Sequence, residues 1–377
     1  MENTIENTKL IEDTSLIKTR ESGIELFRII SMLLIIAHHY VVNSGVLLVA
    51  NTSPTSINSL FLYLFGGWGK TGINCFVLIT GYFMCKSNIS TKKFFKLLLE
   101  IEFYRIIIYA IFIISGYAQL TLSGFVRAVL PITSVAQNFT GCYLLFFLLI
   151  PFLNVVVKNI SERQHVFLIL VLLLIYTIIG SIPKFTVNMN YVSWFIVLYF
   201  IASYVRIYPK KIFDSKMFWG ILSLILLIVS AMSILVLTYL GNKLGMDLKF
   251  YFVSDSNKIL ALVTAFSAFM YFKNLKFKSK FINGVASTTF GVLLIHANSD
   301  LMRQWLWGDV CKVVDAYGSN FMILHAIISV VIIFITCTII DYLRVKFIEK
   351  PIMKKFDAVF SKVDDFIKGS NKKGEQI

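Results

Sequence analysis

An acid, an arginine and two histidines lie inside the first apolar stretch of this sequence, GIELFRIISMLLIIAHHY, at residues 23–40. Charged groups are costly within an apolar helix, so Glu25, Arg28 and His39 are candidates for binding and catalysis. In a helix, the eleven steps from Arg28 to His39 bring both side chains within about 20° of each other around the axis. They also lie about 16 Å apart along it, so they share one face and can hold two ends of a long ligand.

The residue types on this face indicate their chemistry. Glu25 precedes Arg28 by three residues and is within its reach. An imidazole with an unperturbed pKa of about 6.5 is suited to general base catalysis, which is the role we predict for His39. His38 points about 80° away from Arg28 and is the weaker candidate. A structural alternative is that the arginine reaches the lipid headgroups and the histidine lies in the opposite interface.

A second polar set lies in STTFGVLLIHANSDLMRQWLW, at residues 287–307. If this stretch is one helix, His296 and Asp300 share a face and Arg303 lies one turn further on. We interpret this set, together with Tyr143 in residues 138–154, as a binding site open to the outside. The alternative for His296 is a packed histidine with a satisfied hydrogen bond.

A basic cluster precedes the third apolar segment. Lys93 and Lys96, next to Lys92, are suited either to the phosphates of a nucleotide-containing ligand or to lipid headgroups. Further along, Glu102 and Arg105 are three apart and are predicted to pair. The sequence FGGWGKTG, residues 65–72, resembles a phosphate-binding loop but lacks the first glycine, so we interpret its glycines as a tight entry into the following helix, with close packing near Asn74 and Gly81.

Composition assigns the chain to polytopic membrane proteins. Of its 377 residues, 57% are hydrophobic and 15% are charged, with a mean hydropathy of +0.76, which excludes a soluble domain. The net charge of +15 does not indicate nucleic-acid binding, because the basic residues lie in short loops and in the C-terminal tail. The five cysteines lack metal-ligand spacing and are predicted to be packing residues, with no metal bound.

The order of apolar segments predicts an all-α bundle of about ten transmembrane helices. Most basic residues lie in the two tails and in every second loop, so both termini are predicted to be cytoplasmic. The predicted organisation is a polar tail at 1–22, a transmembrane domain at 23–351 and a basic cytoplasmic tail at 352–377. The predicted spans are 24–46, 60–84, 95–116, 140–157, 166–182, 191–208, 217–240, 256–272, 285–307 and 319–342.

Residues 23–351 resemble acyltransferase family 3, membrane O-acyltransferases of bacterial surface polysaccharides. Arg28, ten intervening residues and His39 match the first-helix signature of the family, with Glu25 as the preceding acid. Lys93 and Lys96 stand where members commonly carry arginines, which removes the bidentate guanidinium but keeps the charge. The sequences of 72–84, 138–154, 194–209 and 287–296, with Glu349 and Pro351, are also similar to the family pattern.

The resemblance implies transfer of an acetyl group from cytoplasmic acetyl-CoA to a cell-surface or lipid-linked saccharide, at the bacterial plasma membrane. Whether the transfer is direct or passes through an acetyl-histidine remains open. A transporter or flippase of a lipid-linked saccharide is the alternative function. The candidate residues are His39, Arg28 and Glu25 for catalysis, Arg28, Lys93, Lys96 and Arg105 for the donor, and Tyr143, His296 and Asp300 for the acceptor.

Overall fold

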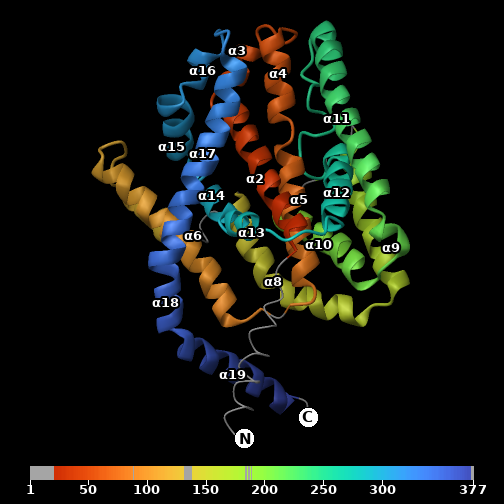
Figure 1. The fold of residues 1–377 in the computed structure, drawn as a ribbon, viewed down its shortest axis with the longest axis vertical. Helices are drawn as coiled ribbons and strands as arrows, with labels where there is room; N and C mark the ends of the chain where they lie inside the picture. The colour runs from red at the N-terminus through yellow and green to blue at the C-terminus, as the bar shows by residue number, and fades with distance from the viewer. Residues whose placement is uncertain are drawn as a thin grey trace, which may run out of the picture.

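The computed structural model describes residues 21–87, 89–130, 138–182, 185, 187 and 189–374, with side chains through residue 366. These residues form helices joined by short connections (Figure 1). The longer helices are α2 (Ser22–Val42), α5 (Gly69–Met84), α6 (Thr91–Ile114), α8 (Phe139–Asn159), α10 (Tyr191–Ile207), α11 (Lys216–Leu244), α12 (Ile259–Lys273), α17 (Met322–Arg344) and α19 (Asp357–Gly374). The shorter ones are α3 (Val46–Ala50), α4 (Ile57–Gly66), α7 (Leu122–Val129), α9 (Glu162–Leu173), α13 (Lys280–Ala286), α14 (Thr289–His296), α15 (Asp300–Gln304), α16 (Val313–Ala316) and α18 (Lys350–Lys355).

Short segments of π or 3-10 helix extend or connect these elements. They are η2 (Leu174–Ile178), η3 (Ile179–Ser181), η4 (Lys211–Asp214), η5 (Trp305–Val310) and η6 (Val345–Glu349). Within the described part of the chain, five helical stretches are long and apolar enough to cross a membrane: Ser22–Val42, Phe139–Asn159, Glu162–Ser181, Lys216–Leu244 and Met322–Lys355. Two shorter apolar helices, Tyr191–Ile207 and Ile259–Lys273, lie beside them. The predicted all-α membrane bundle is therefore confirmed, whereas ten spans and the sides of the termini stay predictions.

The long helices run between two ends of the bundle. At one end, which we call the basic end, lie the starts of α2, α6, α9 and α11 and the ends of α5, α8, α10, α12 and α17. Hydrogen bonds join these termini: Ser22 N to Phe277 O (2.8 Å), Asn154 Nδ2 to Met84 O (3.2 Å), Tyr204 OH to Glu162 Oε1 (3.0 Å) and Asn274 Nδ2 to Phe213 O (2.8 Å). This end holds the basic loops that the sequence analysis placed in the cytoplasm.

The second predicted span is interrupted. Residues 60–84 form α4 and α5, which are separated at Gly67 and Trp68. The glycines around this break let α2 approach very closely. A Cβ on Gly66 would lie 2.6 Å from Val41 Cβ, and one on Gly69 would lie 2.1 Å from His38 Cγ. The break thus sits directly against the last turn of α2, where His39 lies.

Replacing Gly69 with alanine is expected to lower the free energy of unfolding by about 1–3 kcal/mol, because the added methyl group forces His38 or α5 to shift. The thermal unfolding midpoint of the purified protein in detergent measures this loss. Gly284→Ala is the matched control, because a Cβ on this helical glycine of α13 meets no atom within 4 Å. Equal midpoints for the two variants would contradict the close packing.

The ninth predicted span is not one helix, and this part of the prediction is wrong. Residues 285–307 are divided among α13, α14, α15 and η5, with α14 ending at His296 and α15 beginning at Asp300. The side chain of Ser299 caps α15 by accepting a hydrogen bond from Met302 N at 3.2 Å. His296 and Asp300 therefore belong to different helices and do not share a face.

A buried ion network joins α6 to the end of α17 and to η6. The guanidinium of Arg344 contacts Glu100 Oε1 at 3.0 Å, Asp341 Oδ1 at 2.8 Å and Glu349 Oε2 at 2.8 Å. Tyr104 OH donates a 2.9 Å hydrogen bond to Asp341 Oδ1. Because the Arg344 side chain is 3% exposed, Glu100 and Asp341 depend on this buried cation for charge compensation, whereas Glu349 also contacts Lys96 Nζ at 2.8 Å. The network fixes how α6 and α17 cross near the basic end.

Candidate active site

Two histidines from distant parts of the chain meet inside the bundle. His39 lies in the last turn of α2, and His296 is the last residue of α14. His39 Nδ1 and His296 Nε2 are 3.0 Å apart, which is hydrogen-bond distance. His296 is fully buried, whereas His39 is partly exposed. His39 therefore points into the protein with its second ring nitrogen left for other contacts.

The hydrogen bonds around this pair determine its tautomers. His296 Nδ1 lies 2.6 Å from Val292 O, and a carbonyl oxygen only accepts hydrogen bonds, so His296 Nδ1 carries the proton. In a neutral pair, His296 Nε2 is then the acceptor and His39 Nδ1–H must be the donor. This leaves the lone pair of His39 on Nε2, the nitrogen that can remove a proton from a substrate.

Neighbouring polar side chains are held by structural contacts. His38 Nδ1 lies 2.7 Å from Gly66 O, so it satisfies the carbonyl at the end of α4. Tyr40 OH lies 2.9 Å from His325 Nδ1, and this contact joins α2 to α17. Of the two histidines at the end of α2, His39 is thus the one directed at the second imidazole.

Arg28 and Glu25 lie at the other end of the same helix face. Arg28 Nε is 3.7 Å from Glu25 Oε2, and the Glu25 side chain is 1% exposed. The guanidinium lies 6.0 Å from the ring centre of Phe76, whose ring is 6.1 Å from that of Tyr143. Tyr143 therefore belongs with Arg28, on the side of the bundle where Phe76 lies, and its hydroxyl contacts Thr80 Oγ1 at 3.1 Å.

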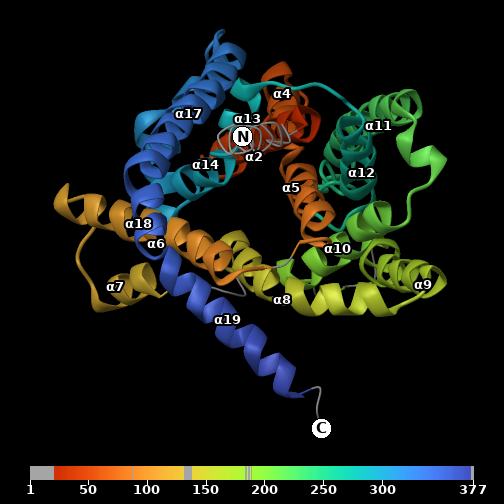
Figure 2. The same cartoon turned by 60° about the horizontal axis from the view of Figure 1, so that its bottom comes forward.

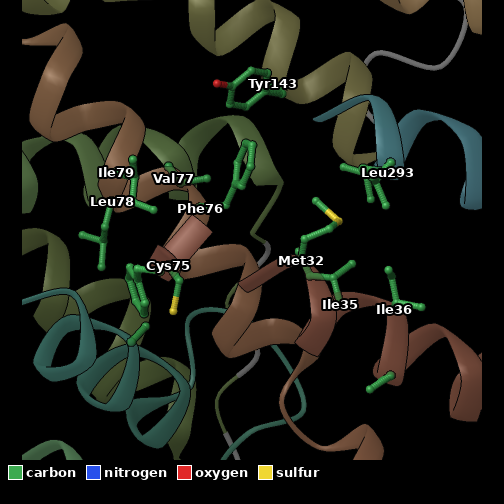
Figure 3. Close-up of a cluster of buried hydrophobic side chains, with 14 of the residues drawn as sticks. Met32, Ile35, Ile36, Cys75, Phe76, Val77, Leu78, Ile79, Tyr143 and Leu293 are labelled. Atoms are coloured by element: carbon green, nitrogen blue, oxygen red, sulfur yellow. The ribbon is translucent and has the colours of Figure 1, made fainter. Parts of the chain in front are cut away.

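Apolar side chains fill the helix face between Arg28 and His39. Met32 and Ile35 are 0% and 3% exposed. Figure 3 shows both of them between the segments that carry Phe76 and Leu293, with Phe76 pointing toward Tyr143. A ligand arm that joins Arg28 to His39 along this face must displace these two side chains.

The donor-binding residues predicted in α6 do not form one site. Lys96 Nζ contacts Glu349 Oε1 at 2.8 Å, and Lys93 Nζ donates to Ser87 Oγ at 2.6 Å, both at the basic end. Arg105 instead donates to the carbonyls of Arg127 and Leu130, at the end of α7. Arg105 therefore fixes α7, and Glu102 makes no hydrogen bond to it among the described residues.

Asp300 is directed away from the histidine pair. Its side chain is 96% exposed and contacts Arg303 at 2.6 Å. Of the three predicted acceptor residues, only His296 contacts His39. The His296 side chain is buried against His39 and does not line an open site. The break after His296 explains this difference, because it turns Asp300 out of the bundle.

Two groups of polar residues in the structure were not predicted from the sequence. Lys70, in the first turn of α5, contacts Tyr191 OH at 2.6 Å and Asp255 at 3.5 Å, which joins the starts of α5 and α10 to the connection between α11 and α12. Arg344 forms the ion network described above. A signal for Arg344 was present, because Asp341 precedes it by three residues at the end of an apolar run.

The chain matches a known protein family over most of its length. A family model described as an acyltransferase domain matches residues 21–342, which include both histidines of the pair. No curated protein and no solved structure matches the chain.

Proposed function

This chain belongs to acyltransferase family 3, and from that premise we propose a membrane O-acetyltransferase that moves an acetyl group from cytoplasmic acetyl-CoA to a hydroxyl of a cell-surface or lipid-linked saccharide. The observation that carries the proposal is the hydrogen bond between His39 and His296. This hydrogen bond fixes the tautomer of His39, so the domain has a histidine that can act as a general base. We place the basic end in the cytoplasm of a bacterial plasma membrane, in keeping with the positive-inside rule.

His39 performs the proton transfers of the proposed reaction. Its Nε2 removes the proton of the acceptor hydroxyl while the hydroxyl oxygen attacks the thioester carbonyl. The bond between the carbonyl carbon and sulfur then breaks, and the departing thiolate takes the proton from Nε2. The products are the acetyl ester and the free thiol of the donor, with His39 returned to its starting state.

His296 acts through His39. While Nε2 of His39 carries the proton, the ring is positively charged and its Nδ1–H strengthens its hydrogen bond to His296 Nε2. Val292 O holds His296 in the tautomer that can accept this bond. His296 is therefore a positioning residue in this mechanism rather than a contact of the acceptor.

Donor binding is proposed at the basic end. The phosphates of acetyl-CoA would contact Lys93 and Lys96, which are partly or largely exposed there, and Arg28 would attract them further in. The separation of about 16 Å between Arg28 and His39 suits an extended thioester arm. Because Met32 and Ile35 fill the intervening face, the arm binds only if these side chains move.

The decisive experiment is transfer of radiolabel from acetyl-CoA to saccharide by membranes that contain the protein, with mass spectrometry of surface glycans from cells with and without it. We expect these membranes to transfer label to the saccharide. Cells without the protein should keep the polymer but lack its acetyl groups. Loss of the whole polymer, with no label transferred, would identify a transporter instead. Labelled succinyl-CoA in the same assay tests whether the donor is limited to acetyl groups.

Replacing His296 with alanine is expected to lower kcat by about 10–100-fold with little change in the KM for acetyl-CoA, because His39 loses the acceptor of its Nδ1–H. Initial rates at varied acetyl-CoA concentration measure the two constants separately. His296→Gln, whose amide oxygen can accept the same bond, is expected to recover part of kcat. A rise in KM at constant kcat would instead assign His296 to substrate binding.

A further inference from the structure

The C-terminal helix α19 carries an exposed apolar strip. Val359, Val363 and Phe366 are 51%, 38% and 78% exposed. At about 100° per residue, these three side chains fall within an arc of about 60° around the helix. A strip of large exposed apolar side chains on a helix that also has a charged face is typical of helices that lie in a membrane interface.

A neighbouring part of the helix holds α19 on the bundle. Phe360 is 6% exposed, and its ring centre lies 5.1 Å from that of Phe95 in α6. Asp364 Oδ1 accepts hydrogen bonds from Thr91 N and Oγ1 at 2.8 and 2.6 Å, and Asp357 contacts Lys92 Nζ at 2.5 Å. The start of α6 therefore fixes which side of α19 faces the protein.

Charges are sorted around α19 relative to the apolar strip. Lys362 lies about 70° from the centre of the strip, whereas Asp357 and Asp364 lie about 130–150° from it. The two acids that contact α6 are thus turned away from the strip, and the lysine borders it. The exposed Lys354 and Lys355 immediately precede the helix. This pattern is complementary to a negatively charged surface.

The position of α19 places the strip at the basic end of the bundle. In both views it turns away from α17 and runs past the basic end of the bundle, then beyond the other helices (Figures 1 and 2). Thr91, which it contacts, is the first residue of α6, so α19 lies at the basic end, where α6 begins.

We propose that α19 is an amphipathic anchor whose strip of Val359, Val363 and Phe366 inserts into the membrane leaflet at the basic end, with anionic lipid headgroups bound by Lys354, Lys355 and Lys362. The anchor fixes the start of α6 against the lipid surface through Asp364 and Asp357. This inference depends on the chain spanning a membrane and not on the acyl-transfer reaction, so the two can fail separately.

The test uses the full chain in nanodiscs and reports the depth of single nitroxide labels. The five native cysteines are replaced first, and one cysteine is introduced as Phe366→Cys or Asp365→Cys. We expect the label at 366 to collide more with oxygen than with a water-soluble nickel complex, and the label at 365, about 100° away, to show the reverse. Equal, water-like collision at both positions would overturn the proposal, as would protection of 366 from both reagents, which indicates a protein partner.

The lipid charge is tested with nanodiscs of phosphatidylcholine alone or mixed with phosphatidylglycerol. Phosphatidylglycerol is expected to increase burial of the label at 366. A triple variant is expected to remove this increase; it combines Lys354→Glu, Lys355→Glu and Lys362→Glu. Each lysine near a charged surface contributes about fivefold to binding. Lys243→Glu, at the opposite end of the bundle, is the control and should change nothing. An increase that survives the triple variant would overturn the assignment of headgroup binding to these lysines.

Discussion

Alanine in place of His39 is expected to lower the rate of acetyl transfer by about 10²–10⁴-fold while the protein remains inserted and folded. The reason is that Nε2 of His39 is the base in the proposed reaction, and its hydrogen bond with His296 holds it in the tautomer that can act. The measurement is label transfer from acetyl-CoA at saturating donor, normalised to the amount of purified protein.

His165→Gln is the matched control for this experiment. His165 is also a buried histidine that contacts a carbonyl, with its Nε2 at 3.0 Å from Phe200 O, but it lies on α9 away from the histidine pair. We expect this variant to retain the transfer rate. A His39→Ala protein that transfers acetyl groups at the normal rate would show that the base lies elsewhere and would leave the His39–His296 contact with a structural role.

The helices that the sequence predicted well are those with long, uninterrupted apolar runs. α2, α8, α11 and α17 belong to stretches that meet the length and hydropathy of a membrane span. The interruptions were harder to predict, because an apolar run continues through them. The break at Gly67 and Trp68 is flanked by Gly66 and Gly69, whose close contacts with α2 only the folded bundle shows. Before α15, however, the sequence Asn298, Ser299, Asp300 was a helix-start signal that could have been used.

The shared helix face of Arg28 and His39 was predicted because it depends on one helix, whereas the contact of His39 with His296 was missed because it depends on two. Helical geometry alone places Arg28 and His39 on one face of α2. The partner of His39 comes from 257 residues away, and no periodicity in the sequence relates such positions. The burial of Met32 and Ile35 between Arg28 and His39 was likewise not predicted. Periodicity shows which way a side chain points from the helix, but it does not show whether the space beside that helix face is empty or packed.

Methionine in place of Arg344 is expected to lower the free energy of unfolding by about 3–5 kcal/mol, because three carboxylates lose the buried cation that they share. The thermal unfolding midpoint in detergent measures the loss. Lys346→Met is the control, since this exposed lysine lies two residues further on, in η6. Adding Glu100→Gln, Asp341→Asn and Glu349→Gln to the arginine variant is expected to recover part of the stability, since the uncompensated charges are then removed.

Arg344→Met is also expected to change the position of the histidine pair. Gly291 of α14 lies directly against Asp341, and a Cβ there would be 2.1 Å from Asp341 Oδ1. Asp341, held by Arg344 and Tyr104, thus sets how closely α14 approaches α17, and α14 carries both Val292 O and His296. At a temperature where both variants are folded, Arg344→Met should therefore transfer acetyl groups more slowly than Lys346→Met. Equal rates would show that the ion network stabilises the bundle without positioning His296.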